Sequence, residues 1–297
     1  MGRHIAPKSE LAGLHNIKIR CVNTFLSSPQ GVYGGPMSSP SEAAASGLSL
    51  VGKKVFFLHP HSVIKDELLA RVIAAEYEVY TLKDRERALN ILKRFPESIL
   101  FINIDAGMKE PEWEKYVRHI QSDPELNSTR LGILSYNNDK ELMQKYLFEI
   151  GIPCGFIQLK LGLEQSTKII LTALKANEAK GRRKYVRVNC ERDGKATLNF
   201  KSATGVANAT IIDISSAGLA CRFLSDPGLT PKTHLRSIQL KLRGKLLPID
   251  GILMGTRSDD SNVWVMLFDP KTETGHKATI RDFIHSELQR QLEDIDI

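Results

Sequence analysis

The hydrophobic and polar positions follow two different periodicities, one before and one after about residue 179. Between residues 51 and 178, continuous apolar runs alternate with segments in which apolar residues recur at every third or fourth position. The continuous runs are typical of strands buried on both faces, and the spaced pattern is typical of amphipathic helices. Beyond Gly181, apolar and polar residues alternate in short segments separated by turn residues, which indicates antiparallel strands.

The first half is predicted to contain five strand–helix units. The expected strands cover residues 54–58, 78–82, 98–104, 130–135 and 155–159, and the expected helices cover 62–77, 84–95, 111–121, 139–151 and 163–177. Strands and helices in strict alternation predict a doubly wound parallel sheet with helices on both faces. We therefore expect an α/β domain over residues 51–178.

The second half is predicted to be an antiparallel β-barrel or sandwich closed by a helix. The expected strands cover residues 185–190, 195–200, 208–215, 219–224, 236–242, 247–256 and 262–268. The expected helix covers 276–293, with Ile280, Phe283, Ile284 and Leu288 on one face. We therefore expect a β-barrel domain over residues 179–297.

Residues 1–50 differ in composition from both halves. They are rich in Ser, Gly, Pro and Ala, and such a segment cannot bury enough apolar area to fold. We expect this segment to be disordered. Met37 lies within it and is an alternative start of the chain.

The overall composition is that of a globular protein of the cytoplasm. Hydrophobic residues make up 42% of the chain and charged residues 25%. No apolar run approaches the roughly 18–20 residues that a membrane helix needs. The four cysteines are scattered and form no CxxC pair, so neither a zinc cluster nor a disulfide framework is expected.

The net charge of +7 is unevenly distributed. Residues 51–179 carry 18 basic and 18 acidic side chains, whereas residues 180–297 carry 19 basic and 14 acidic ones. This modest excess favours a small anionic ligand at least as well as a nucleic acid.

A cluster of basic residues opens the second half. Arg182, Arg183, Lys184 and Arg187 lie within ten residues that contain no acid, GRRKYVRVNC. Arginine forks match the geometry of phosphate and of guanine edges, so the cluster is a candidate anion site. Taken alone, the cluster is better explained as a solvated linker or as a strand start with a basic face.

A second candidate motif follows at residues 213–219, DISSAGL. Asp213, Ser215 and Gly218 form the pattern D-x-S-x-x-G, and Arg183 and Arg187 form R-x-x-x-R. An ordinary Asx or Ser turn before a strand would explain the second pattern by itself. The two patterns together, in this order and in a β-rich domain, are far more specific than either alone.

This pair of motifs resembles the signature of the PilZ family over residues 180–290. The resemblance implies a PilZ β-barrel that binds the bacterial second messenger cyclic di-GMP. Its ligand-binding residues would be Arg182, Arg183, Arg187, Asp213, Ser215 and Gly218. Arginine forks suit the two phosphodiesters and guanine O6 and N7, and Asp213 can accept from guanine N1–H and N2–H. Gly218 would allow an unusual backbone conformation and a close approach. Ser215 would bond the ligand or fix the turn.

Arg182 bears on the number of ligands. In the family, the residue before R-x-x-x-R influences whether an intercalated pair of ligands binds. A basic residue at this position favours close stacking of its side chain over two ligands. The sequence leaves the number of ligands per site open.

The first half resembles the receiver domains of bacterial response regulators, but without their phosphorylation chemistry. Receivers place an acidic pair after the first strand, where this chain has HPHS at residues 59–62. Asn103 occupies the phosphate-acceptor position and Asp105 lies two residues on, while Ser135 and Lys160 match the remaining positions. Without the acidic pair, Mg²⁺ has too few oxygen ligands. We expect a receiver-like domain that is not phosphorylated.

The two histidines after the first strand are a weak metal candidate. His59 and His61 could bind a metal, but no suitable third ligand is close in sequence. We interpret them as part of a polar loop, and no metal or cofactor is expected besides the ligand cyclic di-GMP.

These features favour a non-enzymatic cyclic di-GMP receptor. Ordering of the arginine-bearing linker by the ligand would reorient the two domains and so signal to a partner protein. One alternative is a response regulator phosphorylated on the receiver-like domain, with a binding output domain. A PilZ protein that acts only through protein contacts is another. No phosphate loop, G-x-S-x-G or H-E-x-x-H motif indicates an enzyme.

The partner itself is not identified by the sequence. The candidate partners are the motility, pilus, polysaccharide and transcription machinery. The candidate outputs include motility and biofilm formation. Because no helix-turn-helix pattern is present, direct DNA binding is not expected.

Overall fold

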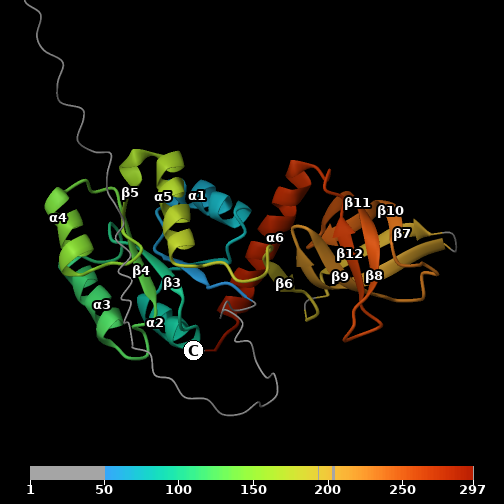
Figure 1. Cartoon of the computed structure of the whole chain (residues 1–297), viewed down its shortest axis with the longest axis horizontal. Coiled ribbons are helices and arrows are strands. Elements are labelled where there is room, and N and C mark those ends of the chain that lie inside the picture. Colours follow the sequence, from blue (N-terminus) through green and yellow to red (C-terminus); the bar gives the residue numbers. More distant parts are fainter. Residues whose placement is uncertain (1–50, 193, 203–204, 297) are drawn as a thin grey trace, which may run out of the picture. The chain divides into compact units, whose positions relative to one another are not determined.

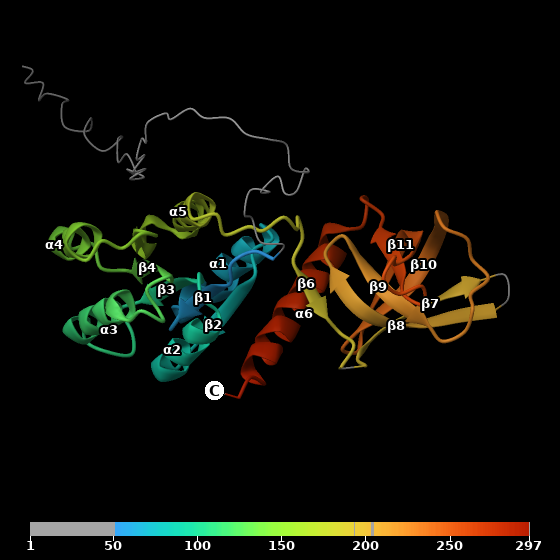
Figure 2. The same ribbon diagram turned by 60° about the horizontal axis from the view of Figure 1, so that its bottom comes forward.

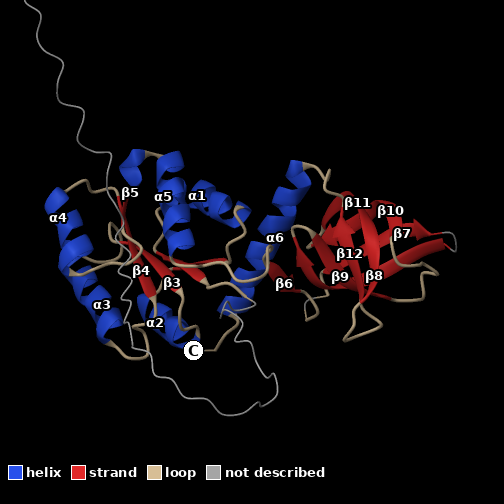
Figure 3. Cartoon of the chain, viewed as in Figure 1, coloured by secondary structure: helices blue, strands red, loops and turns tan. Residues whose placement is uncertain are grey.

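The computed structural model describes residues 51–192, 194–202 and 205–296, all of which belong to one compact unit. The disorder expected of residues 1–50, and the alternative start at Met37, lie outside the described residues. Figures 1 and 3 show the elements along the chain. We call residues 51–179 the α/β half and residues 180–296 the barrel half. The expected domain boundary after residue 178 stays a prediction.

The α/β half is a parallel sheet of five strands in the order β2-β1-β3-β4-β5, which confirms the predicted architecture. The strands are β1 Val55–Leu58, β2 Val79–Leu82, β3 Ile99–Asn103, β4 Arg130–Ser135 and β5 Phe156–Gln158. The central strands β1 and β3 are buried throughout, as their continuous apolar runs indicated. Because β1 and β3 are parallel, their carboxyl ends lie at the same edge of the sheet.

Helices cover both faces of this sheet (Figure 2). They are α1 Ser62–Ala74, α2 Arg85–Arg94, α3 Glu110–Ser122, α4 Lys140–Gln144 and α5 Leu163–Ala176. Val55 and Phe57 pack with α1 and α5, whereas Phe56 and Leu58 pack with α2 and α3 on the opposite face. This alternation follows from the pleat of a strand that is buried on both sides.

Two local departures interrupt the regular pattern of the α/β half. The single helix expected at 139–151 is α4 continued by a π-helical turn, Lys145–Glu149, which buries Tyr146. A 3-10 turn, Leu159–Leu161, separates β5 from α5.

The barrel half is a closed antiparallel barrel with one additional strand at its edge (Figure 3). Its strands are β6 Arg187–Asn189, β7 Ala196–Ser202, β8 Gly205–Ser215, β9 Gly218–Phe223, β10 Thr233–Leu242, β11 Lys245–Thr256 and β12 Trp264–Phe268. Six of them close in the order β8-β7-β10-β11-β12-β9, because β9 also pairs with β8. The predicted barrel is confirmed, but β6 pairs only with β8.

The predicted C-terminal helix is α6, Thr274–Glu293, and its apolar residues are buried in a hydrophobic cluster that includes residues of the barrel half. It also contacts the α/β half. The backbone N–H of Thr81 donates to Gln289 Oε1 over 2.9 Å, and Gln289 Nε2 donates to the Thr81 carbonyl over 3.0 Å. Because β2 is the edge strand of its sheet, the Gln289 amide satisfies backbone groups that an adjacent strand would otherwise pair.

A second contact holds the carboxyl end of α6. Nη2 of Arg87 donates to the carbonyls of Leu292, Glu293 and Ile295 over 3.0–3.2 Å. The last carbonyls of a helix lack partners within the helix, and a cation there is favoured by the helix dipole. The helix predicted to close the barrel is therefore also bound to the α/β half.

Candidate functional site

The pairing of β6 with the end of β8 brings the two sequence motifs together. In this antiparallel pair, Arg187 lies opposite Ser215 and Asn189 lies opposite Asp213. The second arginine of R-x-x-x-R therefore adjoins the D-x-S segment, although the two are far apart in the sequence. The role of these residues in binding stays a prediction.

Asp213 lies between two arginines. Its Oδ1 is 3.6 Å from Nη1 of Arg187, and its Oδ2 is 3.4 Å from Nη1 of Arg257. The Asp213 side chain is 19% exposed, whereas that of Arg187 is 51% exposed. A largely buried carboxylate thus holds two cations at a surface that a ligand can reach.

Ser215 and Gly218 shape the turn between β8 and β9. The Ser215 hydroxyl is buried and donates to the Gly218 carbonyl over 3.0 Å, so it fixes the turn. A Cβ at Gly218 would lie 2.3 Å from the carbonyl oxygen of Met266 on β12. A side chain at Gly218 would therefore collide with β12, and the expected role of Gly218 towards the ligand stays a prediction. Its φ is not positive, so an unusual backbone conformation is not the reason for glycine there.

Arg183 and Arg187 line a small cavity of about 50 Å³, together with Tyr185 and Val186. Arg182 and Arg183 are both exposed. The arginine cluster is thus accessible to a dissolved anion, and one of its members, Arg187, lies beside the Asp213 carboxylate.

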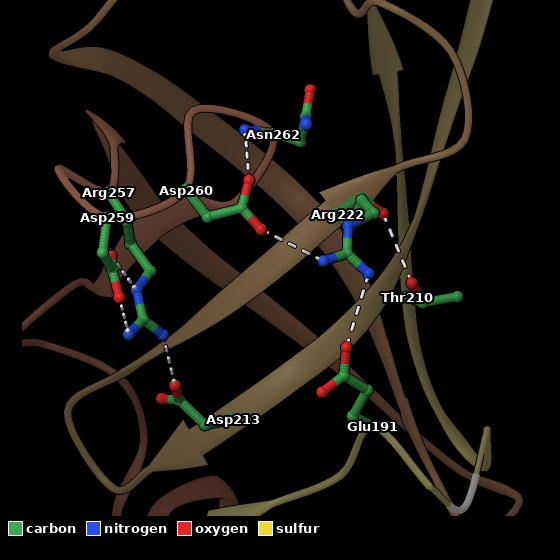
Figure 4. Close-up of polar contacts among 8 residues, drawn as sticks. All are labelled: Glu191, Thr210, Asp213, Arg222, Arg257, Asp259, Asp260 and Asn262. Atoms are coloured by element: carbon green, nitrogen blue, oxygen red, sulfur yellow. Dashed lines mark hydrogen bonds and ion pairs between the residues drawn. The ribbon is translucent and has the colours of Figure 1, made fainter.

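Arg257 was not predicted from the sequence. It follows β11, and its guanidinium bonds the Asp259 carboxylate over 2.9 and 3.0 Å in addition to Asp213 (Figure 4). The hydrogen bonds that Arg257 donates to Asp259 raise the pKa of Arg257 above its ordinary value, and burial opposes this change. The sequence signal was the pattern RSDD after an expected strand, which becomes informative only when β11 is known to lie near β8.

Arg222 on β9 makes a parallel set of contacts (Figure 4). Its Nη2 is 3.2 Å from Asp260 and its Nη1 is 3.5 Å from Glu191. The backbone N–H of Asn262 orients Asp260 by a bond of 2.9 Å. Acidic side chains therefore occupy both Arg257 and Arg222, and an anion that approaches either arginine would compete with these carboxylates.

The α/β half has a polar cluster at the carboxyl ends of its strands. Asn103, at the end of β3, donates from Nδ2 to the His59 carbonyl over 2.8 Å. Asp105 accepts from the Ser135 hydroxyl and from the Tyr136 N–H, both over 2.6 Å. Asn103 therefore occupies the end of β3 as predicted, and the nearby carboxylate is already bonded to the end of β4.

Lys160 lies in the 3-10 turn after β5, and its Nζ is 3.4 Å from Oδ1 of Asn138. The position after β5 agrees with the sequence alignment. This contact joins Lys160 to the side-chain amide of a loop residue.

The two histidines of the β1–α1 loop make ring contacts. The ring of His59 packs edge-on against the ring of Trp113, with 5.8 Å between the ring centroids. The ring of His61 packs against that of Tyr136, with 4.6 Å between the centroids. Burial lowers the pKa of His59. Within the part of the chain that the structure describes, no group of three or more His, Cys, Asp or Glu side chains is placed to hold a metal ion.

Several solved structures are similar in fold to parts of this chain. A PilZ domain of YcgR from Escherichia coli, solved with c-di-GMP, is 16% identical, with a TM-score of 0.32 over 38% of this chain and 95% of that one. The K. pneumonia MrkH–c-di-GMP complex is 16% identical, with a TM-score of 0.32 over 39% of this chain and 57% of that one.

The α/β half has similar structures of its own. The chemotaxis response regulator CheY4 of Vibrio cholerae is 17% identical, with a TM-score of 0.33 over 41% of this chain and 99% of that one. No family model and no curated protein sequence matches the chain.

Among the described residues, no helix has the length and apolarity required to span a membrane.

We expect acetyl phosphate with Mg²⁺ to leave the mass of the full chain unchanged. The β1–α1 loop offers His59 and His61 where carboxylates would be needed to hold Mg²⁺. Asn103 cannot form an acyl phosphate, and Asp105 is engaged by Ser135. Intact-mass spectrometry checks this, and an increase of one phosphate that maps to Asp105 would contradict it.

Proposed function

We propose that this protein is a non-enzymatic receptor for cyclic di-GMP with a PilZ-type barrel. The observation that carries this proposal is the β6–β8 register, which sets Arg187 opposite Ser215 and within 3.6 Å of Asp213. Two motifs that are weak separately thus share one surface, with an exposed arginine cluster and a carboxylate side by side. This combination suits a ligand that offers both anionic phosphates and guanine donors.

Each side chain has a role that follows from its chemistry. Arg183 and Arg187 bind phosphodiester oxygens or guanine O6 and N7 by charge-assisted hydrogen bonds. Asp213 accepts from guanine N1–H and N2–H. Arg257 already contacts Asp213, so we add it to the proposed site. Arg182 directly precedes Arg183 in the same cluster, where it would affect how many ligands stack.

The fixed turn has a supporting role in the same proposal. Ser215 and Gly218 hold β8, β9 and β12 in the arrangement that presents Asp213. The site is therefore built largely before the ligand arrives, which reduces the entropy lost on binding.

The proposed signal is a change in the orientation of the α/β half relative to the barrel half. The arginine-bearing segment 180–187 is also the connection between the two halves. Because a ligand shifts an equilibrium only by its differential affinity, the phosphates must favour one arrangement of that segment. We propose that this arrangement is read by a cytoplasmic protein partner, from motility, pilus, polysaccharide or transcription machinery.

Small-angle X-ray scattering with and without saturating cyclic di-GMP tests the proposed signal. We expect the ligand to change the scattering curve of the full chain and Arg187→Ala to abolish the change, because the variant lacks a phosphate contact. Identical curves for the unmodified chain would leave a receptor whose signal is read from the barrel surface alone.

Two alternatives remain distinct in their chemistry. A phosphorylated response regulator is disfavoured by Asn103 at the end of β3 and by the absence of acids at residues 59–62. A PilZ-type protein that acts only through protein contacts would have the same fold but would not need accessible arginines. Binding measurements separate this alternative from the receptor.

We expect cyclic di-GMP to bind the full chain with micromolar affinity or better. Arg183→Ala and Arg187→Ala should each weaken binding about tenfold to a hundredfold, which corresponds to about 1.5–3 kcal/mol for a lost hydrogen bond to a charged group. Isothermal titration calorimetry gives the dissociation constants.

Arg236→Ala is the matched control for these variants. Arg236 is an exposed arginine of β10 in the same barrel half, so its removal changes the net charge equally without touching the motif. Unchanged affinity in both motif variants, or an equal loss in the Arg236 variant, would remove the assignment of R-x-x-x-R.

A further inference from the structure

A carboxylate from the α/β half lies within the proposed ligand site. Glu76 follows α1 and has a φ of +60°, a left-handed conformation that non-glycine residues rarely adopt. Its side chain is only 11% exposed. A buried charge on a strained backbone requires compensating contacts, and Glu76 has three of them.

The three hydrogen-bond donors come from separate parts of the chain. The Val186 N–H donates to Glu76 Oε2 over 3.2 Å, and the Ser216 hydroxyl donates to Oε1 over 2.6 Å. Nε of Arg281, on α6, donates to Oε1 over 3.0 Å. One carboxylate therefore connects the loop after α1 with the segment just before β6, with the β8–β9 turn and with α6.

Two of these donors lie inside the two ligand motifs. Val186 lies between Arg183 and Arg187 of R-x-x-x-R, and Ser216 lies between Ser215 and Gly218 of D-x-S-x-x-G. Glu76 thus fixes the approach of one motif to the other from the side of the α/β half.

The contacts of Glu76 leave the motif side chains available. Glu76 uses a backbone N–H of one motif and, from the other, a hydroxyl outside the defining positions. Arg281 neutralises its charge, which reduces repulsion of an incoming phosphate. This arrangement favours alignment of the site over competition with the ligand.

We propose that Glu76 is a positioning residue for the cyclic di-GMP site and that it links ligand affinity to the α/β half. This inference rests on the proposed function. Glu76 holds the backbone of β6 and the β8–β9 turn in register before binding, so less order remains to be gained when the ligand arrives. By reciprocity, the ligand strengthens the contacts of Glu76 by the same factor by which Glu76 strengthens ligand binding.

Calorimetric titration of full-length variants with cyclic di-GMP tests this inference. Glu76→Ala should raise the dissociation constant about tenfold, because two motif segments lose a shared acceptor. Glu76→Gln retains one of the two acceptor oxygens, for Val186 or for Ser216 but not for both donors, and should recover part of the affinity. Circular dichroism at the titration temperature confirms that each variant is folded.

The matched control is Gln289→Ala, which removes the contact of α6 with Thr81 and touches neither motif. Its dissociation constant should stay within about twofold of the unmodified chain, since distant sites act independently. An equal loss in this variant would show that general contact between the halves matters, and would overturn the role of Glu76.

A double-mutant cycle gives a readout that mere stability would not change. Ser216→Ala alone should weaken binding, but it should add nothing in a Glu76→Ala background, because the shared bond is already lost. Additive effects, or unchanged affinity in folded Glu76→Ala, would overturn the inference while leaving the proposed function intact. Failure of the unmodified chain to bind would instead overturn the proposed function itself.

Discussion

The short antiparallel pairing of β6 with the end of β8 is the constraint on which the site depends. β6 is only three residues long and lies outside the closed barrel, so its position is set by the hydrogen bonds to β8. A shift of one residue would turn Arg187 to the opposite face and separate it from Asp213. The burial of Val188 between the exposed residues Arg187 and Asn189 opposes such a shift.

Contacts beyond the barrel reinforce this register. Glu76 bonds the backbone at Val186, one residue before β6 begins. Helix α6 adds an independent attachment, through Gln289 at the edge strand β2 and Arg87 at its carboxyl end. The connection between the halves therefore has hydrogen-bonded partners, and a ligand acting on it would rearrange defined contacts.

Much of the fold could be predicted because its signals are local. Continuous apolar runs identified β1 and β3, and alternation identified the barrel strands. The position of Asn103 at the end of β3 followed from the same run. Each of the two motifs was recognisable because the residues within it lie close together along the chain.

The remaining features depend on tertiary contacts that a sequence pattern does not report. Arg257 acquires its meaning only when β11 lies near β8, and Glu76 only when α1 lies near the β8–β9 turn. Gly218 was singled out from its motif, but its closeness to the Met266 carbonyl reflects strand packing that spacing cannot reveal. Likewise, β6 was predicted as one more barrel strand, because alternation cannot distinguish an edge strand from a closing one.

Hydrogen–deuterium exchange of the full chain with and without cyclic di-GMP tests the central claim most directly. The account predicts slower exchange in peptides covering residues 182–190 and 213–219, because the ligand contacts and stabilises both motifs at once. The backbone of the β1–α1 loop, residues 59–62, should be unaffected. Slowed exchange confined to the carboxyl ends of the strands in the α/β half, or no change at all under saturating ligand, would contradict the account.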